Sequence, residues 1–126
     1  MRTYVDSDVL IWHLRGERKA ADFFHRVSAS GAELWIGAIQ RAEIVFFMRP
    51  EVAKLTVNFL SRFKTAALNG EIVDDGGALY RQWNPSHGID VNDALLAATA
   101  LNTGGRIFTL NTRHYPMPDL VVIKAW

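Results

Sequence analysis

The sequence contains no cysteine, few prolines and no long hydrophobic run. The absence of cysteine excludes a disulfide framework, a thiolate zinc site and a cysteine nucleophile, so any metal must be held by oxygen or imidazole. The longest apolar runs, residues 94–98 and 44–48, are far shorter than the roughly 20 residues of a membrane span. We therefore expect no membrane association.

Net charge is also nearly absent. Fourteen lysine and arginine residues stand against thirteen aspartate and glutamate residues, giving a formal net charge of +1. Without a bulk basic field, any binding of nucleic acid must depend on local contacts. Asp6 and Asp8 interrupt the stretch in which a secretory signal would be apolar, which favours a cytoplasmic protein.

The chain has 126 residues, of which 49% are hydrophobic and 21% charged. This composition is typical of one globular domain, and the length is enough for a single sizeable core. We expect residues 1–126 to form that domain.

The hydrophobic pattern alternates between strand and helix along the chain. It predicts short strands at residues 3–6, 33–37, 71–73, 106–110 and 120–124. It predicts a helix after the capping residues 6–8 and further helices at residues 20–27, 38–48, 52–68, 78–83 and 93–101. Strands separated by helices favour an α/β fold with a mostly parallel five-stranded sheet, because parallel neighbours need crossover connections.

Polar residues follow several of these strands. Asp6 ends the first strand, Glu43 lies early in the helix after the second, and Asn111 follows the fourth, while Asp93 opens a helix. In open parallel sheets, ligands bind beyond the carboxyl ends of the strands, where the following helices begin. These residues are therefore the candidates for a functional site.

Glu43 is the most informative of them. Ile39, Ala42, Glu43 and Phe46 share one helical face at i, i+3, i+4 and i+7 spacing, which sets a carboxylate in an apolar stripe. Burying an unpaired carboxylate is costly, so the position suggests a cation or a network of donors. The alternative is a boundary residue that reaches solvent.

Each of the other acids has a structural alternative. Asp6 can cap a helix, and Asp8 is best explained as a first-turn acid favoured by the helix dipole. Asp90 can cap the next helix while Asp93 occupies its first turn. Capping explains the acids less well together, because three carboxylates from distant segments would repel one another at one sheet edge.

A divalent cation would relieve that repulsion. Oxygen ligands without cysteine favour Mg²⁺ or Mn²⁺ over structural zinc, and Mg²⁺ commonly binds one or two carboxylates together with substrate phosphates. The pattern therefore indicates chemistry on phosphate or phosphodiester groups.

Four motifs resemble those of the PIN-domain ribonucleases, in particular the compact toxins of VapBC-type toxin–antitoxin pairs. The resemblance runs nearly end to end, and the third motif is the most specific. The motifs are Tyr4-Val5-Asp6-Ser7-Asp8-Val9-Leu10-Ile11, Ile39-Gln40-Arg41-Ala42-Glu43-Ile44, Asp93-Ala94-Leu95-Leu96-Ala97-Ala98-Thr99-Ala100 and Thr109-Leu110-Asn111-Thr112-Arg113-His114-Tyr115.

The resemblance implies a three-layer PIN-like sandwich and Mg²⁺- or Mn²⁺-dependent endonucleolytic cleavage of RNA. Asp6, Glu43 and Asp93 would be catalytic and would hold the metal. It also implies a homodimer and a small antitoxin protein that inhibits the enzyme by filling the acidic groove.

The sequence departs from the family pattern at the fourth acid. Asn111 offers only a neutral carbonyl, and His114 offers imidazole, which is a poorer Mg²⁺ ligand than carboxylate. Asp90 is a further candidate metal ligand. Gln40 stands where the family often has Ser or Thr, and Asp8 where Asn or Ser is common.

Local basic residues are the candidates for contacts with RNA phosphates. Arg113 lies within the final motif, and Arg15 and Arg41 are further candidates. For each of them the alternative is ordinary solvated surface charge.

Two other functions remain open from the sequence. One is a PIN-like module that binds RNA or protein but has weak turnover, because the fourth acid is missing. The other is a phosphatase similar to the haloacid dehalogenases, whose Asp-x-Asp opening matches Asp6-Ser7-Asp8. That enzyme class requires a lysine between the acid groups and leaves Glu43 unexplained.

Overall fold

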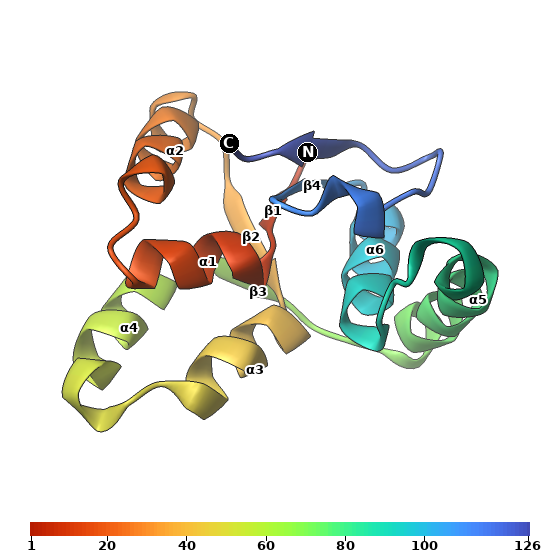
Figure 1. Ribbon diagram of the computed structural model, residues 1–126, viewed down its shortest axis with the longest axis horizontal. Helices are drawn as coiled ribbons and strands as arrows, with labels where there is room; N and C mark the ends of the chain where they lie inside the picture. Colours follow the sequence, from red (N-terminus) through yellow and green to blue (C-terminus); the bar gives the residue numbers. More distant parts are fainter.

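The computed structural model describes all residues, 1–126, as an α/β fold built on one five-stranded sheet (Figure 1). The strand order is β3-β2-β1-β4-β5, and every neighbouring pair is parallel. The prediction of a five-stranded α/β fold is thus confirmed, and the sheet is wholly rather than mostly parallel. None of the helices is long and apolar enough to cross a membrane.

The elements follow one another in this order: β1 (Thr3–Val5), α1 (Ser7–Leu14), α2 (Arg18–Ala29), β2 (Leu34–Gly37), α3 (Ala38–Phe47), α4 (Ala53–Leu60), β3 (Lys64–Ala66), α5 (Gly70–His87), α6 (Val91–Thr103), β4 (Arg106–Thr109) and β5 (Val122–Lys124). Two short 3₁₀ turns lie at η1 (Pro50–Val52) and η2 (Thr112–His114).

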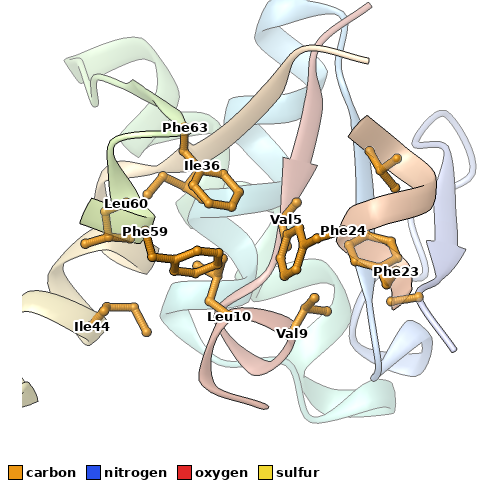
Figure 2. Close-up of a cluster of buried hydrophobic side chains, with 12 residues drawn as sticks. Val5, Val9, Leu10, Phe23, Phe24, Ile36, Ile44, Phe59, Leu60 and Phe63 are labelled. Carbon is orange, nitrogen blue, oxygen red and sulfur yellow. The ribbon is translucent and has the colours of Figure 1, made fainter. Parts of the chain in front are cut away.

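The alternation of side chains along the strands divides the interior into two cores. In β1, Val5 joins a cluster with α1, α2 and α4, whereas the preceding Tyr4 joins the opposite cluster with α6. Phe23, Phe24, Phe59 and Phe63 fill much of the first cluster (Figure 2). The molecule therefore has three layers, with α1, α2 and α4 on one face of the sheet and α5 and α6 on the other (Figure 1).

Two predicted elements are wrong. The predicted helix over residues 52–68 ends at Leu60, and residues 64–66 form the edge strand β3, which pairs with β2. Lys64 and Thr65 are exposed, so this strand lacks the apolar alternation by which strands are recognised. The predicted strand at residues 71–73 is instead the first turn of α5.

Helix α5 was recognised only near residues 78–83, because Asn69-Gly70 and Gly76-Gly77 resemble turns in the sequence. The Asn69 side chain caps the helix by accepting a hydrogen bond of 2.9 Å from the backbone N–H of Ile72. A β-carbon at Gly76 would lie 3.2 Å from Cδ2 of Leu95, so this glycine permits close packing of α5 on α6. Pro85 falls in the last turn, where it breaks few helical bonds.

Candidate active site

A polar cleft lies at the carboxyl ends of β1, β2 and β4, as parallel-sheet geometry predicts. Its volume is about 180 Å³, and none of its ten lining residues is hydrophobic, lysine or arginine. The lining residues are Asp6, Ser7, Asp8, Gln40, Glu43, Asp90, Asn92, Asp93, Asn111 and His114. The structure thus brings together all six residues predicted from the sequence as catalytic or metal-binding.

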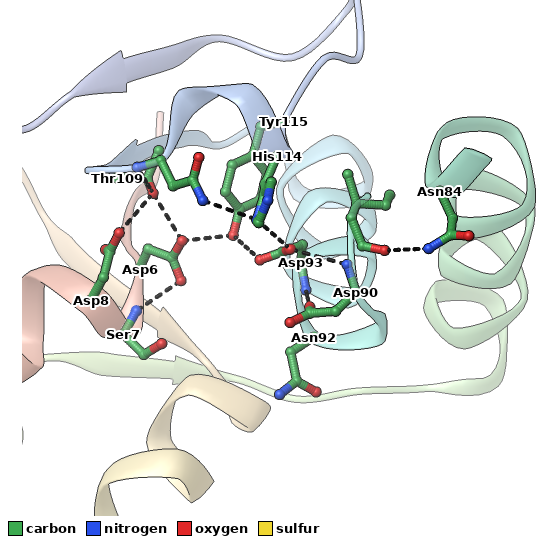
Figure 3. A network of polar contacts seen from close by, with 12 residues as sticks. Asp6, Ser7, Asp8, Asn84, Asp90, Asn92, Asp93, Thr109, His114 and Tyr115 are labelled. Atoms are coloured by element: carbon green, nitrogen blue, oxygen red, sulfur yellow. Dashed lines mark hydrogen bonds and ion pairs between the residues drawn. The ribbon is translucent and has the colours of Figure 1, made fainter. Parts of the chain in front are cut away.

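Asp6 is the most deeply placed of the acids, with 7% of the residue exposed. It follows β1 and begins α1, where its Oδ1 accepts a 2.8 Å hydrogen bond from the backbone N–H of Ser7. Its Oδ2 accepts from the hydroxyls of Thr109, at 2.9 Å, and Tyr115, at 2.8 Å (Figure 3). Burial raises the pKa of Asp6 even though these donors favour its ionised form.

Glu43 is half-buried at the margin of the cleft. Its two carboxylate oxygens accept from the Ser7 hydroxyl at 3.0 Å and from the Asn92 amide at 3.4 Å. Burial and the negative charges of neighbouring aspartates raise its pKa. The apolar stripe proposed for α3 is wrong, because Phe46 is 79% exposed and the buried residues of this helix are Gln40 and Ile44.

Asp93 shares a reciprocal capping arrangement with Asp90 at the start of α6. Asp90 Oδ1 accepts from the backbone N–H of Asp93 at 2.7 Å, and Asp93 Oδ2 accepts from that of Asp90 at 3.1 Å. The predicted capping role of Asp90 is confirmed, and the same residue also lines the cleft. Burial raises the pKa of Asp93 to about 6, and the nearby Asp90 and Asp6 charges add to this effect.

The final motif closes the cleft from the β4 side. His114 Nδ1 lies 3.1 Å from Asp93 Oδ2 and 3.1 Å from the Asn111 amide nitrogen (Figure 3). The imidazole therefore stands beside Asp93. Tyr115 of the same motif is buried, and its hydroxyl also lies 3.4 Å from Asp93 Oδ1.

Asp8 belongs to the cleft, although the sequence favoured a simple dipole role for it. Its Oδ2 accepts from the Leu110 backbone N–H at 3.0 Å and lies 3.3 Å from the Thr109 hydroxyl. Burial raises its pKa to about 6, and the Asp6 charge contributes to the rise. The link to β4 depends on tertiary contact, which local sequence does not reveal.

Ser7, Asn92, Thr109 and Tyr115 were also not singled out as site residues. Each donates a hydrogen bond to an acid of the cleft. Thr109 and Tyr115 lie within the final motif, which was the available signal. Nothing local marks Ser7 or Asn92.

The three predicted RNA-binding arginines lie outside the cleft lining. Arg113 is exposed and donates to the Ser86 carbonyl at 3.4 Å, and Arg41 donates to the Thr65 hydroxyl at 3.3 Å. The Arg15 guanidinium lies 5.5 Å from the Trp12 ring. RNA binding by these three arginines stays a prediction.

The donor set fits a hard divalent cation that keeps part of its hydration shell. Five carboxylates and no lysine or arginine line the cleft, and their oxygens are the ligands that Mg²⁺ and Mn²⁺ prefer. No three Asp, Glu or His side chains are close enough to form a complete protein cage. Such an ion would therefore depend on water and phosphate oxygens for its remaining ligands.

A second hollow, mainly apolar and of about 510 Å³, adjoins the cleft through Glu43. Ile11 and Leu14 of α1 line it together with Ile44 and Phe47 of α3. Phe47 is 82% exposed, which is unusual for a large aromatic side chain. We refer to this hollow as the apolar groove.

The sequence comparisons with known proteins agree on one family. The PIN domain profile matches residues 3–120. Ribonuclease VapC19 of Mycobacterium tuberculosis is 34% identical over 118 residues, which cover 92% of this chain and 94% of that protein. Ribonuclease VapC10 of the same organism is 35% identical over 114 residues, which cover 90% of this chain and 85% of that protein.

Solved structures share the fold at lower identity. A toxin–antitoxin complex from Klebsiella pneumoniae contains a chain with a TM-score of 0.81 and 21% identity, covering 98% of both chains. VapBC2 from Rickettsia felis, solved with a DNA fragment from its promoter, gives a TM-score of 0.80 at 19% identity. That match covers 100% of this chain and 99% of the other.

Proposed function

Because this chain belongs to the PIN-domain family, we propose that it is a metal-dependent endoribonuclease and the toxin of a toxin–antitoxin pair. The observation that carries the proposal is the cleft, where Asp6, Glu43 and Asp93 converge from three separate segments without a compensating lysine or arginine. The relatives named as ribonucleases support RNA as the substrate.

Asp6, Glu43 and Asp93 would hold the ion together with water and RNA phosphate oxygens, because their side chains alone do not complete its ligand set. When bound, Mg²⁺ or Mn²⁺ lowers the pKa of a coordinated water and offsets the charge of the phosphate. Thr109 and Tyr115 orient the Asp6 carboxylate, and Ser7 and Asn92 orient that of Glu43. These fixed donors keep the acids aligned before RNA arrives, which reduces the reorganisation needed at the reaction step.

Arg113 is the best placed of the three arginines to meet an RNA phosphate. It is exposed in η2, next to His114 at the cleft edge, and its one side-chain hydrogen bond is a long one to Ser86. Arg41 and Arg15 would contact RNA phosphates farther from the scissile bond.

The antitoxin is proposed to occupy the apolar groove and to reach the cleft past Glu43. The exposed Phe47 offers an apolar anchor, and Arg15 and Arg49 line the same groove. Solved relatives include toxin–antitoxin complexes, which supports such a partner. Co-expression with a candidate antitoxin tests this: Phe47→Glu should abolish co-purification of the antitoxin and leave RNA cleavage intact.

A cytoplasmic homodimer completes the proposal. Light scattering coupled to gel filtration measures the oligomeric state, and a mass of about 28 kDa is expected from two 14.2 kDa chains. A mass of one chain across micromolar concentrations would contradict the dimer.

Cleavage of a panel of structured RNAs tests the enzyme directly. The purified chain should cut RNA with Mg²⁺ or Mn²⁺ and stop in EDTA, and Asp93→Asn prepared in parallel should be inactive. Equal cleavage by the variant would reveal a contaminating nuclease. Metal binding without any cleavage would favour the binding module, whereas a trapped phosphate on Asp6 would favour the phosphatase, for which no lysine lines the cleft.

A further inference from the structure

Gln40 differs from every other residue of the cleft. It lies in the first turn of α3, and only 2% of the residue is exposed. Its side-chain amide makes no hydrogen bond, whereas each of the other nine lining residues makes at least one through its side chain. The residue is buried, but its amide group is open to the cleft, where its hydrogen-bonding capacity is free for a bound molecule.

The backbone is shaped to hold this amide in place. Gly37 ends β2 one turn before Gln40, and a β-carbon there would clash with Gln40 Oε1. The same β-carbon would lie 3.4 Å from Gln40 Cδ and 3.2 Å from Cδ1 of Leu96. A leucine at position 40 would fill a comparable volume but could not hydrogen-bond a molecule in the cleft. Packing therefore does not account for the glutamine.

The amide lies beside the proposed chemistry. Gln40 and Glu43 are three residues apart in α3, which places both side chains on neighbouring positions of one helical face. Both line the same cleft. Whatever Gln40 binds must consequently lie close to the bond that the acids act on.

We propose that Gln40 is a specificity-determining residue that hydrogen-bonds a ribose 2′-hydroxyl of the bound RNA. This inference rests on the proposed ribonuclease function. An amide offers both a donor and an acceptor, and so does the 2′-hydroxyl, whereas a phosphate oxygen only accepts. The surrounding carboxylates also only accept hydrogen bonds, so Gln40 supplies the donor that they lack. Contact with the 2′-hydroxyl is how a protein distinguishes RNA from DNA at a given position.

Stability separates this role from a structural one. Gln40→Leu removes an amide that has no partner within the protein and retains the volume, so its Tm should equal that of the wild type. Its affinity for Mn²⁺, measured by calorimetry, should be unchanged. A lower Tm would make Gln40 a structural residue, and a tenfold loss of Mn²⁺ affinity would make it part of the metal site; either result overturns the proposal.

Activity then tests the contact itself. Oligonucleotides carrying a single 2′-deoxy substitution are walked across the cleavage site and cut with wild type and with Gln40→Leu. At one position, the wild type should lose about tenfold in kcat/KM, as expected for one hydrogen bond. Gln40→Leu should show that loss already on the unmodified RNA and lose nothing further at this position. Gln82→Leu, which changes the exposed glutamine of α5, is the matched control and should behave as wild type.

The outcomes distinguish this inference from the function beneath it. If the wild type cuts RNA while the two changes act independently, the losses in kcat/KM from Gln40→Leu and from the deoxy substitution multiply at every position. In that case Gln40 does not bind the 2′-hydroxyl. If the wild type cuts no RNA with Mg²⁺ or Mn²⁺, the ribonuclease proposal fails and this inference falls with it.

Discussion

Glu43 brings a negative charge into a cleft with four other carboxylates and no lysine or arginine. In the wild type, the Ser7 hydroxyl donates a 3.0 Å hydrogen bond to Glu43. Glu43→Gln removes the charge and keeps a carbonyl oxygen that can accept this hydrogen bond. We expect RNA cleavage to fall more than about 100-fold. Losing a residue that only hydrogen-bonds a metal ligand costs about 10–100-fold, and losing a metal ligand itself should cost more. We also expect a higher Tm at pH 7 in EDTA, because the variant no longer buries a charge and repels the neighbouring aspartates less.

Glu33→Gln is the matched control for this variant. Glu33 pairs with Lys64 at 2.8 Å on the exposed surface, outside the cleft. This change should leave cleavage at the wild-type rate and stability nearly unchanged, because solvent screens an exposed ion pair. Full activity of Glu43→Gln would remove Glu43 from the proposed mechanism.

Tyr115 holds two of the proposed metal-binding acids with one hydroxyl, 2.8 Å from Asp6 Oδ2 and 3.4 Å from Asp93 Oδ1. Tyr115→Phe keeps the ring and removes that donor, so metal affinity or kcat should fall about 10–100-fold. Titration with Mn²⁺ separates the two effects. The free energy of unfolding should change by only about 1 kcal/mol.

Tyr4→Phe tests whether any buried tyrosine hydroxyl has the same effect. Tyr4 is fully buried, and its hydroxyl bonds Thr103 at 2.8 Å, away from the cleft. This variant should lose a comparable amount of stability and no activity. Equal losses of activity from both variants would mean that Tyr115 acts only through general stability.

At the scale of elements, α5 depends on a cap that resembles a turn in the sequence. Asn69→Ala removes the acceptor for the Ile72 N–H and should lower the free energy of unfolding by about 1 kcal/mol, measured by urea denaturation. Asn58→Ala changes an exposed asparagine in α4 whose side chain makes no hydrogen bond, and should be neutral or slightly stabilising. A neutral Asn69→Ala would show that packing on α6 alone determines where α5 begins.

The same helix shows why part of the fold could not be predicted from the sequence. Asn-Gly and Gly-Gly pairs are turn signals when only local chemistry is considered. Here Asn69 caps the helix, and Gly76 allows close approach of Leu95, a contact that exists only in the folded chain. By contrast, β1 and β4 carry strong apolar signals and were recognised, and α6 was recognised by its apolar run and the glycine that ends it.

The candidate site was more predictable than the elements around it. Its acids stand next to the ends of strands or at the starts of helices, positions that a correct strand order brings to one edge. Asp8 and Gln40 were undervalued for different reasons. The bonds of Asp8 reach β4 across the sheet, and the significance of Gln40 is the lack of a partner, which only coordinates can show.

At the scale of the whole molecule, the net charge is nearly zero, but its distribution is uneven because five carboxylates line one cleft without a lysine or arginine. Burial raises the pKa values of Asp6, Asp8, Glu43 and Asp93, those of Asp8 and Asp93 to about 6, so the folded protein binds more protons near pH 6 than the unfolded chain does. Stability without metal should therefore rise as the pH falls from about 7 toward 5. His13 opposes this trend, because burial lowers its pKa and the unfolded chain takes up that proton first. Asp8 and Asp93 together should outweigh one imidazole.

Thermal unfolding between pH 5 and 7.5, with EDTA or with Mn²⁺, tests this balance. In EDTA we expect the Tm to be higher at pH 5.5 than at pH 7.5, since Asp8 and Asp93 titrate at about 6. Mn²⁺ should reverse the order, because the ion competes with protons and stabilises the protein by about 2.7 kcal/mol at 100 times its Kd. Glu43→Gln should weaken both responses, and Glu33→Gln neither. A Tm in EDTA that falls steadily from pH 7.5 to 5 would show that burial and mutual repulsion do not raise the pKa values of the cleft acids, and the electrostatic argument for a bound cation would then be lost.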